Sequence, residues 1–264
     1  MSRSNDDGSY LALSLSTQAA LADFYAEQEA REKRFADLQA QAEQDAELKS
    51  LSMDDFGEDW NASQFWVSEP GTLPPKRLNY DEETAVKLAK QLLEGCSDAS
   101  RIACISAPSV FIQLKKILAS KSTRPRPSLS LFEYDTRFAV FKEFVHYDFQ
   151  HPIRLPSNLK GSFDRVICDP PFLSSDCQTK AALTARWLSK PWSTGLNASA
   201  DDGDATTSSV RLIVCTGERM AEVVQKLYAQ AGIRTTTFEP RHAKGLSNEF
   251  GCYANFRSPE WDWR

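Results

Sequence analysis

Apolar and polar residues follow two periodicities along the second two-thirds of the chain. Between residues 81 and 95, alanine and leucine recur at helical spacing, after an aspartate that can cap a helix and before a glycine that can end one. Helical spacing also predicts helices over 109–120 and 218–232. Short runs rich in β-branched and apolar residues predict strands over 101–108, 128–135, 144–149, 163–172, 211–217, 233–240 and 249–256.

The order of these elements predicts the fold. Apolar strands that alternate with helices are typical of a mostly parallel sheet covered on both faces. The final two strands have no helix between them, so we expect them to be added in an antiparallel sense. The sequence therefore predicts a doubly wound α/β domain.

The amino-terminal part of the chain has a different character. A helix is predicted from about Ser16 to Leu48, because no glycine or proline interrupts a run of good helix formers that Ser16 can cap. Residues 1–59 carry 14 acidic and 5 basic side chains, a balance of −9, whereas the remaining residues carry 22 and 26, a balance of +4. We interpret 1–59 as an acidic helical extension, which is either a solvated helix or an arm that recognises a partner, and 60–264 as the main domain.

Within that domain, residues 190–210 are rich in Gly, Ser, Thr and Asp, which predicts a mobile insertion without a chemical role.

Composition narrows the class of protein. No stretch approaches the roughly 20 apolar residues that cross a bilayer, so no membrane association is expected. The six cysteines form no C-x-x-C pair, which indicates buried reduced thiols and predicts no metal site. The amino terminus "MSRSNDDGSY" lacks the regions of a secretory signal. We expect a cytoplasmic protein.

Acidic side chains follow three of the predicted strands. Because ligands of doubly wound sheets bind beyond the carboxyl ends of the strands, these acids are candidate ligand contacts. Glu133 is the first choice and Asp135 the second for a carboxylate that accepts both hydroxyls of a ribose. Asp148 could accept a hydrogen bond from an adenine amino group, with Phe149 or Tyr147 against the ring.

The fourth predicted strand ends in Asp169, Pro170, Pro171 and Phe172, which we call the Asp-Pro-Pro-Phe corner. Each proline fixes its own φ and biases the preceding residue away from helix, so the corner is rigid. Prolines have no N–H, which leaves the Asp169 carboxylate and the Pro170 carbonyl as acceptors for the two hydrogens of an amino group. Such acceptors stabilise the positive charge that nitrogen acquires during methylation. Phe172 could offer its π face to the substrate or to a cationic methyl donor.

Several segments together resemble a known family. They are "LSTQAALADFYAEQ", "SQFWVS", "FEYDTRF", "CDPPFLS" and "FEPRHAKGLSNEFGCYANF". As a set they are similar to the elongation factor 1-alpha lysine methyltransferases, a eukaryotic subgroup of the class I S-adenosylmethionine-dependent methyltransferases that was once labelled adenine-specific DNA methyltransferase. The resemblance covers the early helix and most of residues 60–256. It implies a Rossmann-like seven-stranded sheet with an N-terminal helical extension, S-adenosyl-L-methionine as cofactor and elongation factor 1-alpha as protein substrate.

The resemblance also implies roles for individual residues. The catalytic set is Asp169, Pro170, Pro171 and Phe172, with Asp169 also near the cofactor. The implied cofactor contacts are Glu133 and Asp148, the "SAPS" turn of Ser106, Ala107, Pro108 and Ser109 beside the methionine part, and Trp66 as a cover. The chain departs from the wider superfamily at the first strand, which ends in "ISAPSVF" where others have a glycine-rich turn.

We therefore expect a monomeric protein-lysine N-methyltransferase. Two alternatives stay open: a nucleic-acid adenine N-methyltransferase, and a noncatalytic binding module on a methyltransferase fold. Adenine methylation needs affinity for phosphates, which the acidic extension opposes, so nucleic acid is not expected as a partner. His242 is either at the rim of the substrate site or a surface or capping residue.

Overall fold

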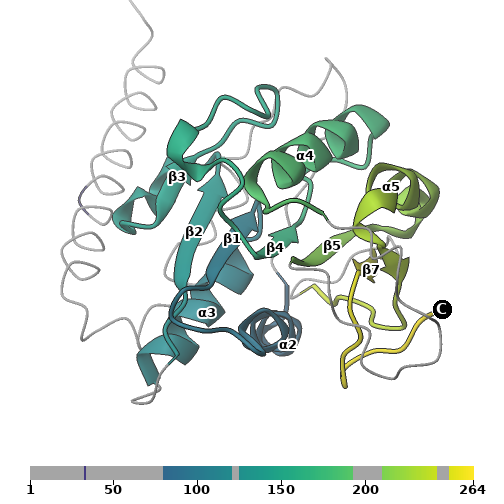
Figure 1. The fold of residues 1–264 in the computed structure, drawn as a ribbon, viewed down its shortest axis with the longest axis horizontal. Coiled ribbons are helices and arrows are strands. Elements are labelled where there is room, and N and C mark those ends of the chain that lie inside the picture. The colour runs from purple at the N-terminus through teal and green to yellow at the C-terminus, as the bar shows by residue number, and fades with distance from the viewer. Residues whose placement is uncertain (1–32, 34–79, 121–124, 193–209, 243–249) are drawn as a thin grey trace, which may run out of the picture.

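The predicted strands form one seven-stranded sheet in the computed structural model, which describes residue 33 and residues 80–120, 125–192, 210–242 and 250–264 (Figure 1). The strands are β1 (Arg101–Ile105), β2 (Ser128–Glu133), β3 (Phe144–His146), β4 (Arg165–Cys168), β5 (Arg211–Gly217), β6 (Arg234–Thr235) and β7 (Phe250–Ala254). Their order is β3-β2-β1-β4-β5-β7-β6. Neighbouring strands from β3 to β5 pair in parallel, and β7 pairs antiparallel with both β5 and β6. The predicted parallel sheet with an antiparallel addition is confirmed.

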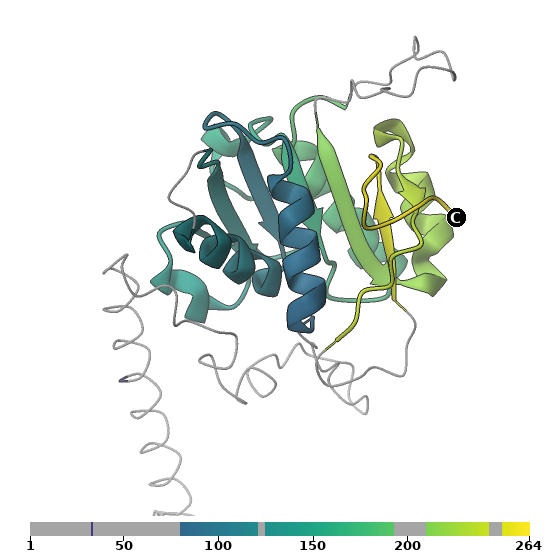
Figure 2. The same ribbon diagram turned by 90° about the horizontal axis from the view of Figure 1, so that it is seen from below.

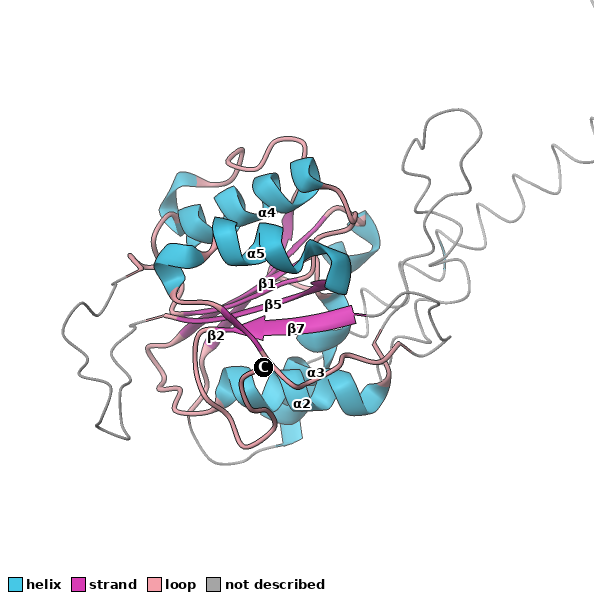
Figure 3. Ribbon diagram, turned by 90° about the vertical axis from the view of Figure 1, so that its right-hand side faces the viewer, coloured by secondary structure: helices cyan, strands magenta, loops and turns pink. Residues whose placement is uncertain are grey.

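Helices cover both faces of this sheet (Figure 3). One face carries α2 (Glu82–Leu93) and α3 (Pro108–Ser120), and the other carries α4 (Ser175–Leu188) and α5 (Ala221–Leu227). Short 3-10 turns are η3 (Thr136–Val140), η4 (Ser157–Leu159), η5 (Glu218–Met220) and η6 (Ala229–Ala231). Alternate residues of β1 enter the two cores: Ile102 and Cys104 lie with α2 and α3, whereas Ala103 and Ile105 lie with α4 and α5.

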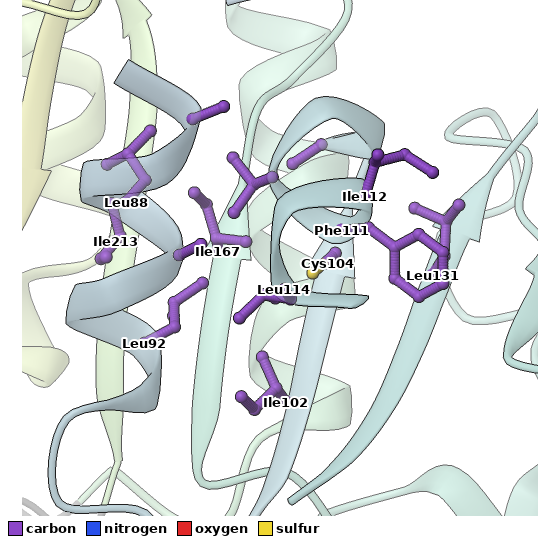
Figure 4. Packing of buried hydrophobic residues seen from close by; sticks show 14 of the residues in the cluster. Leu88, Leu92, Ile102, Cys104, Phe111, Ile112, Leu114, Leu131, Ile167 and Ile213 are labelled. Atoms are coloured by element: carbon purple, nitrogen blue, oxygen red, sulfur yellow. The ribbon is translucent and has the colours of Figure 1, made fainter. Parts of the chain in front are cut away.

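Helix α2 illustrates how the local sequence places an element. Asp81 caps it by accepting a 2.7 Å hydrogen bond from the backbone N–H of Thr84. Leu88 and Leu92, one turn apart, are fully buried and point toward the sheet near Ile213 and Ile167 (Figure 4). Full burial of such a side chain stabilises the fold by about 1.5–3 kcal/mol. These leucines therefore hold α2 against β4 and β5, and the amino end of the helix lies at the bottom of Figure 2.

The structure corrects the sequence prediction in two helical regions. Helix α4 was not predicted, because most of its buried positions are small or polar: Cys177, Gln178, Ala181, Ala182, Thr184, Ala185 and Leu188. The single helix predicted over 218–232 is instead η5, α5 and η6, although it does end at Gly232, which has a φ of +71°. Several strands are also shorter than predicted, β4 and β6 most of all.

Three predictions lie outside the described residues. They are the amino-terminal helix apart from residue 33, Trp66, and most of the insertion at 190–210. The boundary near residue 59 lies there as well, so it stays a prediction. Within the described part of the chain, no helix is both long and apolar enough to cross a lipid bilayer.

Candidate active site at the strand ends

The strand order reverses between β1 and β4, since β1 leads to β2 on one side and β4 leads to β5 on the other. Ser106 follows β1 and Asp169 follows β4, so both lie at this switch point, where doubly wound sheets bind ligands. The backbone N–H of Asp169 donates to the carbonyl of Ile105 over 3.0 Å. The predicted cofactor turn and the predicted catalytic corner are thus adjacent.

The turn after β1 uses a serine in place of glycine. Ser106 has a φ of +53° and is the one non-glycine residue with positive φ in the described ranges. This conformation costs a non-glycine residue about 1–2 kcal/mol. Ser106 is buried, and its N–H donates to the carbonyl of Phe132 over 2.8 Å. The sharp turn expected of a glycine-rich segment is therefore made by a strained serine.

The rest of the "SAPS" turn begins helix α3. Pro108 is its first residue, where the missing N–H breaks no helical hydrogen bond. Ala107, Pro108 and Ser109 are all buried. The chain therefore passes from β1 into α3 through two buried residues, Ser106 and Ala107, at the switch point.

Of the two carboxylates after β2, Glu133 has the environment of a ligand contact. It is 2% exposed, and its Oε1 accepts hydrogen bonds from the N–H of Tyr134 at 2.8 Å and of Asp135 at 3.4 Å. Asp135 instead accepts the N–H of Arg137 at 2.9 Å and forms a 2.7 Å ion pair with the Arg137 guanidinium. Because Asp135 caps η3 and holds Arg137, the structure favours Glu133 as the ribose contact.

The residues after β3 reach the Asp-Pro-Pro-Phe corner. The Asp148 carboxylate accepts the N–H of Gln150 at 2.8 Å and lies 2.9 Å from Nδ1 of His151. Phe149 is 5% exposed, and its ring centroid lies 5.4 Å from that of Phe172. Phe149 thus joins the predicted adenine side of the site to the Asp-Pro-Pro-Phe corner.

Within the corner, Pro170 is buried, and Asp169, Pro171 and Phe172 are half-buried. The corner is braced from helix α4, because Nε2 of the fully buried Gln178 donates to the carbonyl of Phe172 at 3.1 Å and to the hydroxyl of Thr216 at 3.0 Å. Leu173 packs so closely on Gly217 that a Cβ there would lie 3.0 Å from both of its δ carbons. The predicted rigidity of the corner therefore has a tertiary component.

The sequence interpretation assigned no role to Tyr80. This residue precedes α2 and is 5% exposed, and its hydroxyl lies beside the Asp169 carboxylate and the Cys215 thiol. Burial, and then the Asp169 charge, raise the pKa of Tyr80 well above its ordinary value of 10. Its sequence neighbourhood is merely extended and proline-bearing, so no local signal reveals the contact with Asp169.

His242 lies half-buried between two aromatic rings. It forms an isolated β-bridge with Tyr80, and its ring centroid is 5.1 Å from that of Tyr80 and 4.5 Å from that of Phe250. Burial lowers the pKa of His242 to about 4. The imidazole is therefore neutral at pH 7, and it packs beside Tyr80 at the edge of the candidate site.

Known proteins resemble the chain over almost its whole length. A family model described as "Probable N6-adenine methyltransferase" matches residues 58–258. The protein-lysine N-methyltransferase EFM5 of Saccharomyces cerevisiae is 39% identical over 94% of this chain and 93% of its own. The EEF1A lysine methyltransferase 1 of Homo sapiens is 34% identical over 93% of this chain and 92% of its own.

The chain belongs to the family that this model describes and that includes these two protein-lysine methyltransferases. It is a protein-lysine N-methyltransferase, as the resemblance of its motifs implied. The Rossmann-like class I sheet is likewise confirmed by the strand order.

The methyltransferase uses S-adenosyl-L-methionine, and the described residues fit this cofactor. The strained turn at Ser106 lets the backbone approach a ligand closely at the switch point. The carboxylate of Glu133 is held at the end of β2, where a ribose can donate its hydroxyls. The bound cofactor supplies a methyl group activated by a sulfonium.

Proposed function

We propose that this methyltransferase modifies a lysine side chain of elongation factor 1-alpha, and that the Asp-Pro-Pro-Phe corner holds the lysine amine. The proposal for the substrate is supported by the names of relatives that are 34% and 33% identical over more than nine-tenths of this chain. The proposal for the corner is supported by its position beside the predicted cofactor turn that begins at Ser106. The N–H of Asp169 donates a 3.0 Å hydrogen bond to the carbonyl of Ile105, the residue before this turn.

The chemistry begins with a deprotonated lysine. An ammonium with a pKa near 10.4 loses its proton at a cost of about 4.6 kcal/mol at pH 7. Asp169 binds the ammonium as well as the transition state, so its role is orientation and charge stabilisation, and water accepts the proton. The cofactor would supply its methyl group to this amine, and the nitrogen that accepts the methyl group would become positively charged.

The corner stabilises that charge selectively. The carboxylate of Asp169 and the carbonyl of Pro170 accept hydrogen bonds from the two N–H groups of the amine. The segment that directly follows them is held by the bond from Gln178 to Phe172 and by the packing of Leu173 on Gly217, which supports a corner that reorganises little during the reaction. The π face of Phe172 lies at the same corner.

Adenine methylation is a second candidate, because the matching family model carries that description. One experiment separates the two. The full-length protein is incubated with labelled S-adenosylmethionine and, in parallel, with purified elongation factor 1-alpha, DNA or RNA. We expect label in a lysine of the elongation factor. Label only in nucleic acid would overturn the proposal in favour of adenine.

The role of Asp169 has its own test. Asp169→Ala should keep the affinity for S-adenosylhomocysteine within a few-fold and lose most methyl transfer. Wild-type turnover in this variant would refute the role of the carboxylate without affecting the substrate assignment.

We also propose that the protein acts as a monomer in the cytoplasm. The cytoplasmic location is supported by the cysteines, all six of which are free thiols in the structure, five of them buried. Cell fractionation and size-exclusion chromatography with light scattering test both statements. Recovery in a secretory compartment, or a dimer at assay concentrations, would refute one or the other.

A further inference from the structure

The backbone of Tyr80 is held from two sides. The following residue, Asp81, caps helix α2, and its own N–H donates to the carbonyl of Arg241 at 2.9 Å. The N–H of Arg241 donates in turn to the hydroxyl of Thr84 at 3.0 Å. The start of α2 and the segment that contains His242 therefore lock together, and Tyr80 cannot move independently of them.

The ring of Tyr80 is equally confined. It packs against His242, and the His242 ring meets the Phe250 ring edge-on at an interplanar angle of 69°. Phe250 begins β7 opposite Gly217, the last residue of β5. This stack joins Tyr80 to the same sheet edge that carries the Asp-Pro-Pro-Phe corner.

The hydroxyl of Tyr80 is the unusual feature of this arrangement. It is fully buried and makes no hydrogen bond of standard geometry, yet it lies next to the carboxylate of Asp169 and the thiol of Cys215. A buried hydroxyl without a hydrogen bond destabilises the folded protein, and a phenylalanine would avoid that cost. Because the hydroxyl lowers stability and lies beside the proposed catalytic carboxylate, we expect it to have a function.

We propose that Tyr80 is a positioning residue, whose O–H donates to the carboxylate of Asp169 in the reacting complex and so aims the carboxylate at the lysine amine. The inference rests on the proposed role of Asp169. A carboxylate has two oxygens with several lone pairs, so one side can accept from the phenol while the other accepts from the amine. Because burial keeps the phenol protonated, it can serve only as a donor to this anion.

The decisive variant is Tyr80→Phe in the full-length protein. If Tyr80 only fills space, removal of an unpartnered hydroxyl leaves the melting temperature unchanged or raises it, and turnover stays at the wild-type value. If Tyr80 positions Asp169, the melting temperature behaves in the same way but kcat falls by roughly 10- to 100-fold. The KM for the elongation factor and the affinity for S-adenosylhomocysteine should change less than three-fold.

Tyr228→Phe is the matched control. Tyr228 is also a fully buried tyrosine whose hydroxyl makes no hydrogen bond of standard geometry, but this hydroxyl lies beside the thiol of Cys168 and not beside a carboxylate. The residue belongs to the core beneath α4 and α5, and its ring is 5.8 Å from that of Trp192. Its substitution should leave kcat unchanged. An equal loss in both variants would overturn the proposal, because a general effect of losing a buried hydroxyl would then explain it.

A double-mutant cycle separates this inference from the proposed function. In single-turnover assays, Tyr80→Phe should have no further effect in the Asp169→Ala background, since the hydroxyl then has no carboxylate to hold. Independent, multiplicative losses in the two variants would overturn the inference about Tyr80 but leave the role of Asp169 intact. The same conclusion would follow if Tyr80→Phe had the kcat of wild type while Asp169→Ala was impaired. Full activity of Asp169→Ala would refute both the proposed role of Asp169 and the inference about Tyr80.

Discussion

Substitution of Gln178 by leucine should loosen the catalytic corner without touching the cofactor contacts. The amide of Gln178 donates to the carbonyl of Phe172 and to the hydroxyl of Thr216, while its own Oε1 has no partner. Leucine keeps most of the volume but removes both of these hydrogen bonds. At about 1 kcal/mol or more for each lost hydrogen bond, Gln178→Leu should lower the free energy of unfolding by roughly 2–3 kcal/mol.

Two measurements follow from this number. For a domain of this size, the melting temperature should fall by about 2–4 °C for each kcal/mol, or roughly 4–12 °C in total. Because Phe172 loses its brace, kcat should fall by about 10-fold, with the affinity for S-adenosylhomocysteine within three-fold of wild type. The cofactor contacts predicted at Ser106, Glu133 and Asp148 follow β1, β2 and β3, whereas Gln178 lies on α4 and holds the segment after β4.

The control is the next residue along the helix. Thr179 is exposed, and its hydroxyl donates only to the carbonyl of Ser175 at 2.7 Å. Thr179→Ala should therefore change stability by less than about 0.5 kcal/mol and leave turnover unchanged. A Gln178→Leu variant with the melting temperature and kcat of wild type would refute the view that this amide holds the corner in place.

Two further predictions concern the cofactor and pH. Glu133→Gln should weaken S-adenosylhomocysteine binding by about 10-fold or more, since it removes the charge that accepts the ribose hydroxyls, whereas Asp135→Asn should weaken it far less; isothermal titration that ranks the two variants the other way would reverse the assignment. The pKa of His242 lies at about 4 in the folded protein, against an ordinary value of 6.5, so the unfolded chain binds the proton more readily. The stability that depends on neutral His242 is therefore fully present above pH 6.5 and is lost as the pH falls toward 4. His242→Phe, which keeps an aromatic ring between Tyr80 and Phe250, should show a weaker loss of stability over that interval in urea unfolding at a series of pH values, and parallel curves for the two proteins would contradict the assignment.

The amino-acid sequence by itself determined the sheet and the edge at which chemistry occurs. Runs of apolar and β-branched residues identified all seven strands, and the signal was strongest in β1, β4 and β5, because strands buried on both faces need nearly continuous apolar segments. The parallel direction of β1 to β5 brings their carboxyl ends to one edge, which is why Ser106, Glu133 and Asp169 could be grouped before any coordinates. Helix α4 escaped notice, since a helix that packs through alanine and cysteine has little apolar periodicity.

Only the tertiary structure decided which groups act on one another at that edge. Gln178 and Thr216 are 38 positions apart, and Tyr80 and Asp169 lie much further apart in the chain, so no local pattern relates either pair. The sequence already ranked Glu133 above Asp135, and the folded loop adds a reason for that order, because Arg137 pairs with the aspartate. Periodicity reports which residues are buried, because burial follows from the chemistry of each side chain. The partner that a buried polar group meets depends on how separate elements pack, and that is settled only when the chain has folded.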